Sequence, residues 1–510
     1  MRRSKWIYLS AMVLVIAAAM LFAFLDGDDD VVRYHQHREQ PGEEELGSCS
    51  VCGGQNDLCT HLPIISIDTG GQSIPGNPVR DPDGTILYYE TAEDGAGEIR
   101  VSIRTYEKEG VYHHPEDEPD QTAAALFRIR GNSSRNFDKK SYRIKLVDEN
   151  DPEQSDARAL LGMAKGDEWS LHGPFLDKTL IRNYMWMNIS AQVMGYAPGV
   201  RFCEVLIDGE YQGLYVLMET IDVSPQRVNL TEYRDGDAIF SYMVRLEPRP
   251  DAQKQIDNFN FYTMRTEQGS GIELVYPGTS SQTEAVREYV KTDFSEIERY
   301  LYSYEMAKDP DSCWEYLDLD SFVDYYILQE YLAVSDAFSA STYFYKDVRG
   351  KLHIGPVWDY NNVLDNFFTD LSESDFLLDQ KGWFVPLMKS GLFVDRVISR
   401  YRELRQGVLS DAYIDQYAQE VEVWLGSAID RNFEVWGYSF DVDQLSVDER
   451  RSPTAGRDAL TLEELNPSTH EEALEWMLQY AAGRGAWLDE HIEALRQYCH
   501  PSRNASEVTD

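Results

Sequence analysis

The spacing of hydrophobic positions changes several times along this chain, beginning with an almost purely apolar run of twenty residues from Trp6 to Leu25. Twenty residues in a helix span about 30 Å, which matches the hydrocarbon thickness of a membrane. Lys and Arg precede the run and an acidic cluster follows it, so we expect the N-terminus in the cytoplasm and the bulk of the chain outside. A cleaved signal peptide is the alternative. The length of the run and the lack of a small-x-small cleavage site favour an uncleaved, single-pass anchor.

Strand patterns dominate the first half of the remaining chain. From Leu62 onward, short apolar runs separated by turn residues predict a small β unit. Residues 126–130 and 142–146 alternate with a period of two on either side of a turn at Gly131, which predicts two paired strands. Residues 202–219 contain two apolar runs joined by an Asp-Gly turn, the pattern of a β-hairpin.

Helical spacing dominates the second half. Asp177 is a good N-cap for a helix with a buried apolar stripe. Residues 321–332 are amphipathic and lead to Asp336, while a short apolar run, 353–358, leads to Asp359 as a strand. The last quarter of the chain is mostly helical in pattern. Together these elements predict an α+β protein.

Composition narrows the class of protein. The chain has 510 residues, 43% of them hydrophobic, and 32 Tyr, which indicates a large globular core. Its formal net charge is −41. Nucleic acid is therefore excluded as an expected partner, because phosphate backbones require a basic face. Such a charge maintains solubility and also attracts basic proteins or cations.

Six cysteines follow the apolar run: Cys49, Cys52, Cys59, Cys203, Cys313 and Cys499. Because an exported chain meets an oxidising environment, a local disulfide among the first three is the favoured interpretation. A zinc site and free thiols remain the alternatives. No His or Cys at finger spacing completes a zinc site, although His61 lies nearby. Cys203 falls inside an apolar strand and is expected to be a buried thiol.

Two carboxylates carry the candidate chemistry. Asp336 and Asp359 stand 23 residues apart, each at the end of a predicted element. Phosphoryl transfer needs one carboxylate that orients the attacking hydroxyl and another that holds the metal on the nucleotide phosphates. The sequence contains no His-Glu-x-x-His, Gly-x-Ser-x-Gly or Walker motif that would point to another chemistry. An Asp that only ends a helix is the structural alternative for Asp336.

A basic strand beside a glycine turn supplies a phosphate partner for these carboxylates. Alternation places Arg143 and Lys145 on one face, next to the turn Gly131-Asn132-Ser133-Ser134. Cationic side chains and backbone N–H groups together can bind phosphate. The alternative is an exposed basic edge strand that prevents aggregation.

With both segments in view, the chain resembles the spore-coat CotH kinase family, a group of atypical secreted protein kinases. The resemblance covers roughly residues 125–370 and consists of separate islands that match in order. They are Arg130-Gly131-Asn132-Ser133-Ser134 with Lys139-Lys140-Ser141-Tyr142, Leu161-Gly162-Met163, Asp177-Lys178 with Arg182-Asn183, Tyr211-Gln212-Gly213 with Glu219, Asp336, and Gly355-Pro356-Val357-Trp358-Asp359.

The resemblance implies a protein kinase that uses ATP with Mg²⁺ or Mn²⁺, and it assigns roles to particular residues. Asp336 is the catalytic residue that orients the acceptor hydroxyl. The remaining roles are ATP binding by Arg130, Lys140, Arg143, Lys145, Arg182 and Glu219, with Glu219 at the base, and metal binding by Asp359 and Asn361. Arg182 is alternatively part of a surface pair. The implied partner is a secreted or surface protein, basic and Ser-rich.

The chain departs from kinase patterns at two positions. Ser341 lies where ordinary kinases have a metal-binding Asn, and Asn361 lies where the family has a second Asp. Both changes weaken the expected affinity for metal. They favour a second hypothesis, a catalytically degenerate scaffold or adhesion protein. A carbohydrate-binding protein is a weaker third alternative, based on the number of aromatic residues.

The predicted organisation follows from these patterns and the resemblance. An atypical kinase-like body is preceded by the small β unit and followed by a helical region. The boundaries are 1–25 for the cytoplasmic tip and transmembrane helix, 26–60 for a polar spacer, 61–120 for the β unit, 121–380 for the kinase-like core and 381–510 for its helical C-terminal part.

Overall fold

The computed structural model describes residues 33–52, 58–81, 83, 85–248, 250–258, 271–366, 374–450 and 461–499. The predicted anchor at 1–25 lies outside these ranges. Within them, no helix combines the length and the apolar character that crossing a bilayer requires. Residues 36–510 form one compact unit.

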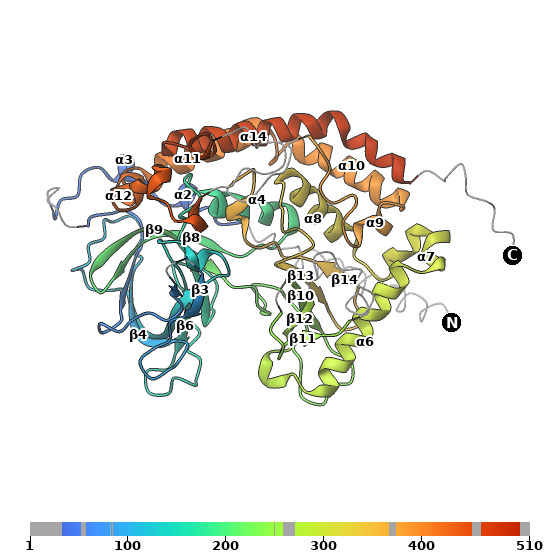
Figure 1. Ribbon diagram of the computed structural model, residues 1–510, viewed down its shortest axis with the longest axis horizontal. Helices are drawn as coiled ribbons and strands as arrows, with labels where there is room; N and C mark the ends of the chain where they lie inside the picture. The colour runs from blue at the N-terminus through green and yellow to red at the C-terminus, as the bar shows by residue number, and fades with distance from the viewer. Residues whose placement is uncertain are drawn as a thin grey trace, which may run out of the picture. The chain divides into compact units, whose positions relative to one another are not determined.

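A closed seven-stranded barrel forms the first half of this unit (Figure 1). Six of its seven strand pairings are antiparallel, and a parallel pairing of β1 with β8 closes it. Around the barrel the strands are β1 (Ile64–Asp68), β4 (Ile99–Tyr106), β5 (Gln121–Arg130), β6 (Ser141–Val147), β7 (Glu168–His172), β9 (Glu210–Glu219) and β8 (Val200–Ile207). The small β unit predicted for 61–120 therefore supplies β1 and β4 to the same barrel as the strands that follow, and the predicted boundary at residue 120 falls between the paired strands β4 and β5.

Alternation along β5 and β6 produces the two faces that the sequence predicts. Phe127 and Ile129 are buried inside the barrel, whereas Arg128 and Arg130 lie on its outer side. The predicted β8–β9 hairpin is also confirmed. Its turn residue Asp208 has a φ of 51° and the following glycine a φ of 82°, the left-handed backbone that such two-residue turns require.

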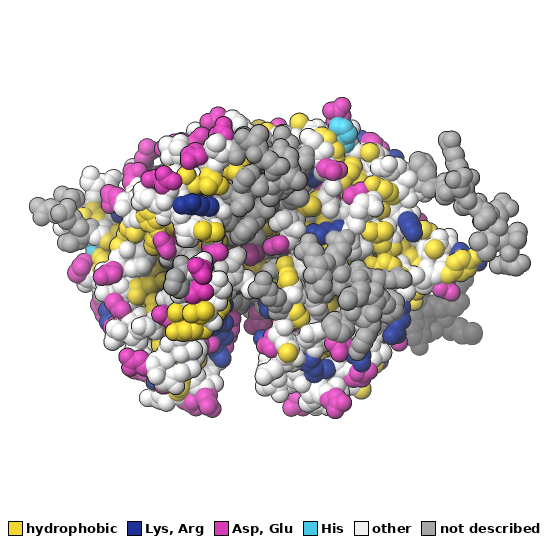
Figure 2. Space-filling view, viewed as in Figure 1, with side chains coloured by type: hydrophobic (Ala, Val, Ile, Leu, Met, Phe, Trp, Pro, Cys, Tyr) yellow, Lys and Arg dark blue, Asp and Glu magenta, His cyan; other side chains and the backbone are white. Residues whose placement is uncertain are grey.

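A five-stranded antiparallel sheet forms the second β layer. Its order is β11 (Gln255–Ile256), β12 (Gly271–Tyr276), β10 (Tyr242–Glu247), β13 (Thr342–Lys346) and β14 (Leu352–Ile354). The last strand is shorter than the predicted 353–358, because pairing with β13 stops at Ile354. The space-filling view in Figure 2 is hollowed between the barrel and this sheet, with Lys and Arg side chains along the barrel side of the hollow.

Helices pack around both sheets. They are α2 (Gln36–Glu39), α3 (Glu43–Leu46), α4 (Arg182–Met194), α6 (Glu284–Leu301), α7 (Tyr304–Lys308), α8 (Leu319–Tyr331), α9 (Phe384–Leu387), α10 (Gly391–Arg405), α11 (Asp411–Leu425), α12 (Ser427–Trp436), α13 (Leu462–Leu465) and α14 (His470–His491). In Figure 1, α6 lies beside the five-stranded sheet, and Phe294 of α6 meets Phe344 of β13 edge to face. The long helix α14 packs against α8 and α11. The mixed α+β class is confirmed, and the C-terminal part is helical as expected.

Helix α4 begins later than predicted. Its first residue is Arg182, not a position next to Asp177. Asp177 nevertheless accepts a hydrogen bond from the backbone N–H of Arg182 at 3.0 Å, so it still satisfies one of the free N–H groups at the helix start. The residues between them form a turn in which Leu180 has a φ of 62°. A cap of this kind reaches across several residues, and sequence spacing alone does not reveal it.

Helix α8 is buried on nearly every side, not only along the predicted apolar stripe. Even Glu330 has a side chain only 2% exposed, and it forms an ion pair of 2.7 Å with Arg484 of α14, whose side chain is 1% exposed. The Glu330 carboxylate also accepts hydrogen bonds from the backbone N–H groups of Leu377 and Leu378. A buried charge requires such partners, and this network fastens α8 to the C-terminal helix.

The segment predicted as a polar spacer is packed against the body from residue 36 onward. The side-chain amide of Gln36 is fully buried, and it bonds both backbone groups of Phe202 in β8, at 2.8 and 3.2 Å. His37 contacts the hydroxyl of Tyr184 at 2.9 Å. Gln36 thereby bonds the edge of β8 opposite β9, next to the point where the pairing with β1 begins at Glu204.

Breaking the ion pair between α8 and α14 should cost far more stability than breaking an exposed one. We expect Arg484→Leu to lower the free energy of unfolding by about 3–5 kcal/mol, because it leaves Glu330 buried without its counter-charge. The matched control, Arg402→Leu, removes a pair with Glu493 whose side chains are 55% and 45% exposed, and it should cost under about 1 kcal/mol. Chemical denaturation of both variants measures the difference. Equal losses would contradict this assignment.

Candidate active site

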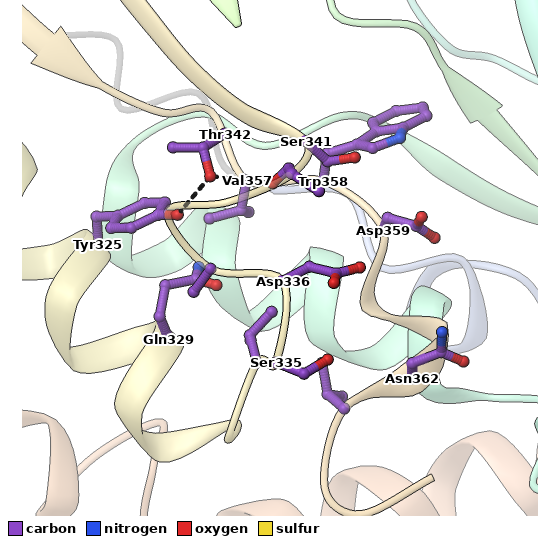
Figure 3. Close-up of a pocket in the computed structure, with 14 residues that line it drawn as sticks. Tyr325, Gln329, Ser335, Asp336, Ser341, Thr342, Val357, Trp358, Asp359 and Asn362 are labelled. Carbon is purple, nitrogen blue, oxygen red and sulfur yellow. Dashed lines mark hydrogen bonds between the residues drawn. The ribbon is translucent and has the colours of Figure 1, made fainter. Parts of the chain in front are cut away.

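Asp336 and Asp359 face one recess (Figure 3). Asp336 follows α8, and Asp359 follows β14 by five residues. The recess is lined by Tyr325, Gln329, Val334, Ser335, Asp336, Ala337, Ala340, Ser341, Thr342, Val357, Trp358, Asp359, Asn362 and Val363. Both carboxyl-bearing residues are exposed to solvent there. The sequence-predicted pair of acids is therefore brought together, at the edge of a space that opens to the outside.

A buried tyrosine connects the segment that carries Asp359 to the helix that precedes Asp336. Tyr360, directly after Asp359, is fully buried. Its backbone N–H donates to the Oδ1 atom of Asn183 in α4 at 2.8 Å, and its hydroxyl accepts from the amide of Gln329 in α8 at 2.9 Å. Since α8 leads directly to Asp336, these two hydrogen bonds fix the Asp359 segment against the helix that carries the other acid.

Arg182 supports the same segment from its other end. The Arg182 side chain is 5% exposed, and it forms an ion pair of 2.6 Å with Asp177. Its Nε atom donates to the carbonyl oxygen of Val363 at 3.1 Å. The predicted alternative of a surface pair is thus wrong, because the pair is buried. The structure places Arg182 as a brace beneath the Asp359 segment.

Hydrogen bonds within the loop after α8 fix the position of Asp336. Its carbonyl oxygen accepts from the backbone N–H groups of Ser339 and Ala340, each at 2.9 Å. The hydroxyl of Thr342 accepts from the N–H of Phe338 at 3.0 Å and contacts the hydroxyl of Tyr325. The loop is therefore tied to itself and to α8, which leaves the Asp336 carboxylate free to face the recess.

Strained backbone concentrates in the two acidic segments. Ten non-glycine residues in the described part of the chain have a positive φ, and six of them lie between 333 and 341 or between 359 and 365. They are Ala333, Phe338, Ser341, Asp359, Leu364 and Asp365. Non-glycine residues avoid this conformation unless the surroundings enforce it, and such residues cluster at functional sites.

The turn after Asp359 brings a residue to the recess that sequence reasoning missed. Residues 360–362 form a 3₁₀ turn, in which side chains three positions apart lie on the same side. Asn362 therefore lines the recess together with Asp359, whereas the predicted metal ligand Asn361 is not among the lining residues. Asn361 lies behind, and its amide nitrogen donates to the Oδ1 atom of Asn362 at 3.2 Å. Asp359 and Asn361 are two residues apart and would share a face in an extended strand, but this segment is a 3₁₀ turn.

Desolvation by the surrounding protein raises the pKa of both carboxyl groups. Desolvation raises the pKa of Asp359 to about 6; Arg130 opposes this shift and Asp336 adds to it. Desolvation also raises the pKa of Asp336, with Lys381 opposing. Because both residues reach solvent, water screens part of this effect. Desolvation is the main cause of both shifts, and repulsion from Asp336 adds to the shift of Asp359 only.

Arg130 connects the barrel to this recess. Its guanidinium group lies 5.5 Å from the ring centroid of Trp358 and donates a hydrogen bond to Ser170 of β7. Electrostatic attraction to Asp359 partly offsets the desolvation that lowers the pKa of Arg130. The glycine turn of the barrel and the tryptophan-flanked aspartate, predicted to share a site, therefore meet through this arginine.

The other predicted phosphate-binding residues of β6 lie on the same outer face of the barrel. Arg143 is held by Glu98 at 2.7 Å and by Glu168 at 2.5 Å. Lys145 lies two positions farther along β6, and its amino group makes no hydrogen bond or ion pair within the described parts of the chain. Arg143 is thus largely neutralised by its neighbours, and Lys145 is the cation of β6 that is open to a ligand.

Two predicted ATP-binding residues are engaged elsewhere. The amino group of Lys140 donates to the carbonyl oxygen of Arg135 at 2.9 Å, on the turn that follows β5. Glu219 is 4% exposed and accepts from the backbone N–H of Gly199 at 2.7 Å at the end of β9. Neither lines the recess. Their roles in nucleotide binding stay predictions, and the structure does not bring them to the two acids.

Two further charged residues, missed by sequence reasoning, lie close to the acids. Lys381 donates to the carbonyl oxygen of Ser335 at 3.0 Å, directly before Asp336. The next residue, Gly382, has a φ of 52°, and a Cβ atom there would come within 2.1 Å of Phe338. Only glycine allows this close approach. In the sequence, only the dipeptide Lys381-Gly382 marks this position, and a dipeptide is too short to indicate a site.

The second missed residue is Glu247 at the end of β10. Desolvation raises its pKa; its neighbour Arg245 opposes this shift, and repulsion from Glu273, Asp336 and Asp359 adds to it. Glu247 is thus close enough to the two acids to repel them, although it does not line the recess. The sequence around Glu247 contains no site motif, and this residue comes near the acids through the pairing of β10 with β13.

The donor set fits a divalent cation. Carboxylate and amide oxygens are the ligands that Mg²⁺ and Mn²⁺ prefer, and Asp359, Asn362 and Asp336 offer them around one space. The Oδ1 atom of Asn361 is also buried without a hydrogen-bond partner among the described residues. The recess itself holds about 20 Å³ of free space, room for an ion or a water molecule only. A nucleotide would therefore extend outside it, along the hollow beside the barrel.

Comparison with known proteins agrees with this geometry. The model of the family described as CotH kinase protein matches residues 127–488, more than two thirds of the chain. The match begins inside β5 and ends inside α14, so it includes Arg130, both acids and the helices that position them. No curated protein matches the chain.

Metal binding at this recess should weaken in acid. Because a metal needs the ionised carboxylate, affinity for Mn²⁺ should fall as the pH drops through about 6, the pKa of Asp359 in the metal-free protein. One pH unit below that value the loss should be about tenfold. Electron paramagnetic resonance of free Mn²⁺, recorded from pH 8 to pH 5, measures it. In Asp359→Asn the same titration should show weak binding at every pH. A flat profile in the unchanged protein would contradict the assignment.

The two asparagines of the 3₁₀ turn should differ in importance. Asn362→Ala is expected to weaken Mn²⁺ binding by about tenfold or more, a loss that is common even for groups behind the first ligands. Asn361→Ala should have a smaller effect, since Asn361 contacts Asn362 and does not line the recess. Parallel Mn²⁺ titrations of the two variants decide. A larger loss in Asn361→Ala than in Asn362→Ala would contradict this assignment and support the predicted ligand pair Asp359 and Asn361.

Proposed function

The chain belongs to the CotH kinase protein family, and from this premise we propose that it transfers the γ-phosphoryl group of ATP to Ser or Thr side chains of another protein. Family membership implies a protein kinase, the use of ATP and an acceptor substrate. The observation that carries the proposal is the convergence of Asp336 and Asp359 on one solvent-open recess. Phosphoryl transfer depends on one carboxylate that orients the acceptor hydroxyl and another that holds the metal.

Each acid has a distinct role in this proposal. Asp336 accepts a hydrogen bond from the acceptor hydroxyl, orients its oxygen toward the phosphorus and takes its proton late in the transfer. Asp359 and Asn362 hold the divalent cation, with Asn361 behind them. When bound, Mg²⁺ or Mn²⁺ supplies positive charge that stabilises the transferring phosphoryl group.

The cations around the recess have supporting roles. Arg130, stacked near Trp358, lies where it can meet phosphate oxygens beside the metal. Lys145 extends the same positive face along the outside of the barrel. Lys381 partly opposes the desolvation that raises the pKa of Asp336. The triphosphate would then lie along the barrel side of the hollow in Figure 2.

The substrate class and location rest on charge and on the N-terminal pattern. A net charge of −41 and a third carboxylate at Glu247 favour acceptors rich in Lys or Arg as well as Ser. The apolar run from Trp6 to Leu25 supports a single-pass anchor with the kinase body outside the cytoplasm. A basic, Ser-rich secreted or coat-type protein fits both features.

A catalytically degenerate scaffold is the second candidate. Ser341 lines the recess at the position where ordinary kinases carry a second metal-binding Asn. Serine is a weaker ligand, and the free space in the recess is small. A protein that binds nucleotide without transferring phosphoryl, or that binds none, would match these features.

Label transfer from ATP separates the two candidates. The full-length protein in detergent is incubated with γ-labelled ATP, Mn²⁺ or Mg²⁺, and a synthetic Ser/Lys-rich peptide, with a Ser/Glu-rich peptide as the charge control. We expect labelling of the basic peptide. Asp336→Asn should lower the rate by about 10²–10⁴-fold while nucleotide still binds, and Asp359→Asn should lose metal-dependent binding as well as transfer. Asp235→Asn changes an exposed acid of the loop between β9 and β10 and should behave as the unchanged protein.

The contrary outcomes are equally specific. Undiminished labelling by Asp336→Asn would remove that residue from catalysis. Nucleotide binding without any transfer, to either peptide or to the protein itself, would favour the scaffold. Self-labelling that depends on Asp336 but leaves both peptides unlabelled would keep the kinase and refute only the proposed substrate charge.

A further inference from the structure

Three cysteines and a histidine converge far from the candidate active site. Cys49, Cys52 and Cys59 follow α3, and His114 lies in the connection between β4 and β5. One ligand atom from each of these residues lies within 4.8 Å of every other. None of the six cysteines, all of them in the described ranges, forms a disulfide in the structure. The local disulfide favoured from the sequence is thus not formed, and the buried thiol expected at Cys203 is confirmed.

We propose that these four residues bind a zinc ion in a closed, structural Cys₃His site. Zinc prefers four ligands of this kind at the corners of a tetrahedron, with Zn–S near 2.3 Å and Zn–N near 2.0–2.1 Å. Those lengths place a sulfur and a nitrogen ligand about 3.6 Å apart. The Sγ atom of Cys49 lies 3.6 Å from the Nε2 atom of His114. This pair is therefore already at the separation that a shared zinc ion requires, and the other ligand atoms lie within 4.8 Å of both.

The surroundings of the histidine prepare it for a metal. The Nδ1 atom of His114 lies 3.2 Å from a carboxylate oxygen of Asp117. Because a carboxylate only accepts hydrogen bonds, Nδ1 carries a proton, and Nε2 is the nitrogen that faces Cys49 and would bind the metal in the neutral ring. A carboxylate behind a histidine ligand is the usual arrangement in zinc proteins. The backbone N–H of His114 also donates to Asp117, at 2.8 Å, which fixes the distance between the two residues.

The backbone around the cysteines is also arranged for a metal. Cys49 and Cys52 have the two-residue separation common in structural zinc sites. The N–H of Val51 donates to the Sγ atom of Cys49 at 3.4 Å, the contact expected to stabilise a thiolate in such a loop. Thr60, next to Cys59, pairs with His113, next to His114, through two backbone hydrogen bonds of 2.8 and 3.2 Å. This short ladder aligns the third cysteine with the histidine.

The site would clamp the N-terminal arm to the barrel. This arm, residues 36–59, is also held by a hydrogen bond of 2.7 Å from the hydroxyl of Tyr112 to the carbonyl oxygen of Gly47 and by one of 3.0 Å from the indole N–H of Trp424 to the carbonyl oxygen of Gln40. Four protein ligands leave no open position, so the ion would have no catalytic role. The histidine is 55 residues beyond the last of the three cysteines, which is why no finger spacing is visible in the sequence.

Metal content and cobalt spectroscopy test the site on the full-length protein, purified under reducing and under non-reducing conditions. We expect about one zinc per chain, and cobalt substitution should give thiolate-to-metal charge-transfer bands with the d–d absorption of a tetrahedral ion. Cys52→Ser and His114→Gln should lose the zinc, while Cys499→Ser, a partly buried thiol elsewhere, should retain it. Asp117→Asn should fold and bind zinc about 10–100-fold more weakly. Chelation should lower the melting temperature of the unchanged protein only where zinc was bound.

Three results would overturn the proposal. The first is an unchanged protein without stoichiometric zinc and without the cobalt thiolate bands. The second is a disulfide between any two of the three cysteines in the protein as isolated without reductant, found by mass spectrometry of peptides. The third is zinc retained at full stoichiometry in His114→Gln. If a ligand variant fails to fold, the cobalt spectrum of the unchanged protein and the affinity of Asp117→Asn still decide.

Discussion

The hydrogen bonds around Tyr360 are the constraint on which the site depends. This residue is fully buried between α4 and α8, and it is tied to Asn183 through its backbone and to Gln329 through its hydroxyl. These contacts fix the backbone directly after Asp359, which faces the recess. Asp336 leaves the same helix that holds the hydroxyl of Tyr360. One buried side chain thus sets the separation of two acids that come from different segments.

This arrangement concentrates strain and unbalanced charge at one edge of the protein. Left-handed residues cluster in both acidic segments, and the two carboxylates repel each other. Such features oppose folding locally, so the surrounding structure must hold them. The buried ion pair of Glu330 with Arg484 and the brace from Arg182 to Val363 supply that support from two sides. A divalent cation would relieve the repulsion, which gives the metal-free geometry a physical reason to bind one.

Local patterns in the sequence predicted the local parts of the fold. The alternation of β5 and β6, the Asp-Gly hairpin and the helical C-terminal part depend on neighbours in the chain, and all are found. The closure of the barrel by β1 and β8 was not predicted, because it pairs residues about 140 positions apart. The boundary expected at residue 120 rested on local patterns and the resemblance, and the polar spacer expected at 26–60 rested on composition; neither kind of information contains such long-range pairing.

In the site too, residues within sequence motifs could be predicted, whereas residues that depend on the fold could not. The two acids and Arg130 were identified because each belongs to a recognisable island, and the structure brings them together. Asn362, Lys381 and Glu247 were missed. The position of Asn362 depends on the pitch of a 3₁₀ turn, and Lys381 and Glu247 come near the acids only through tertiary packing. Lys140 and Glu219 show the converse, since residues from matching islands are engaged by other partners.

The central claim is that both acids serve one metal–nucleotide site. A crystal of the full-length protein grown with Mn²⁺ and a non-hydrolysable ATP analogue tests it most directly, through the anomalous scattering of manganese. The account predicts a manganese peak within bonding distance of Asp359, with the terminal phosphate between that ion and Asp336 and a cation of β5 or β6 beside it. A manganese ion bound elsewhere, or a nucleotide whose phosphates lie away from both acids, would contradict it.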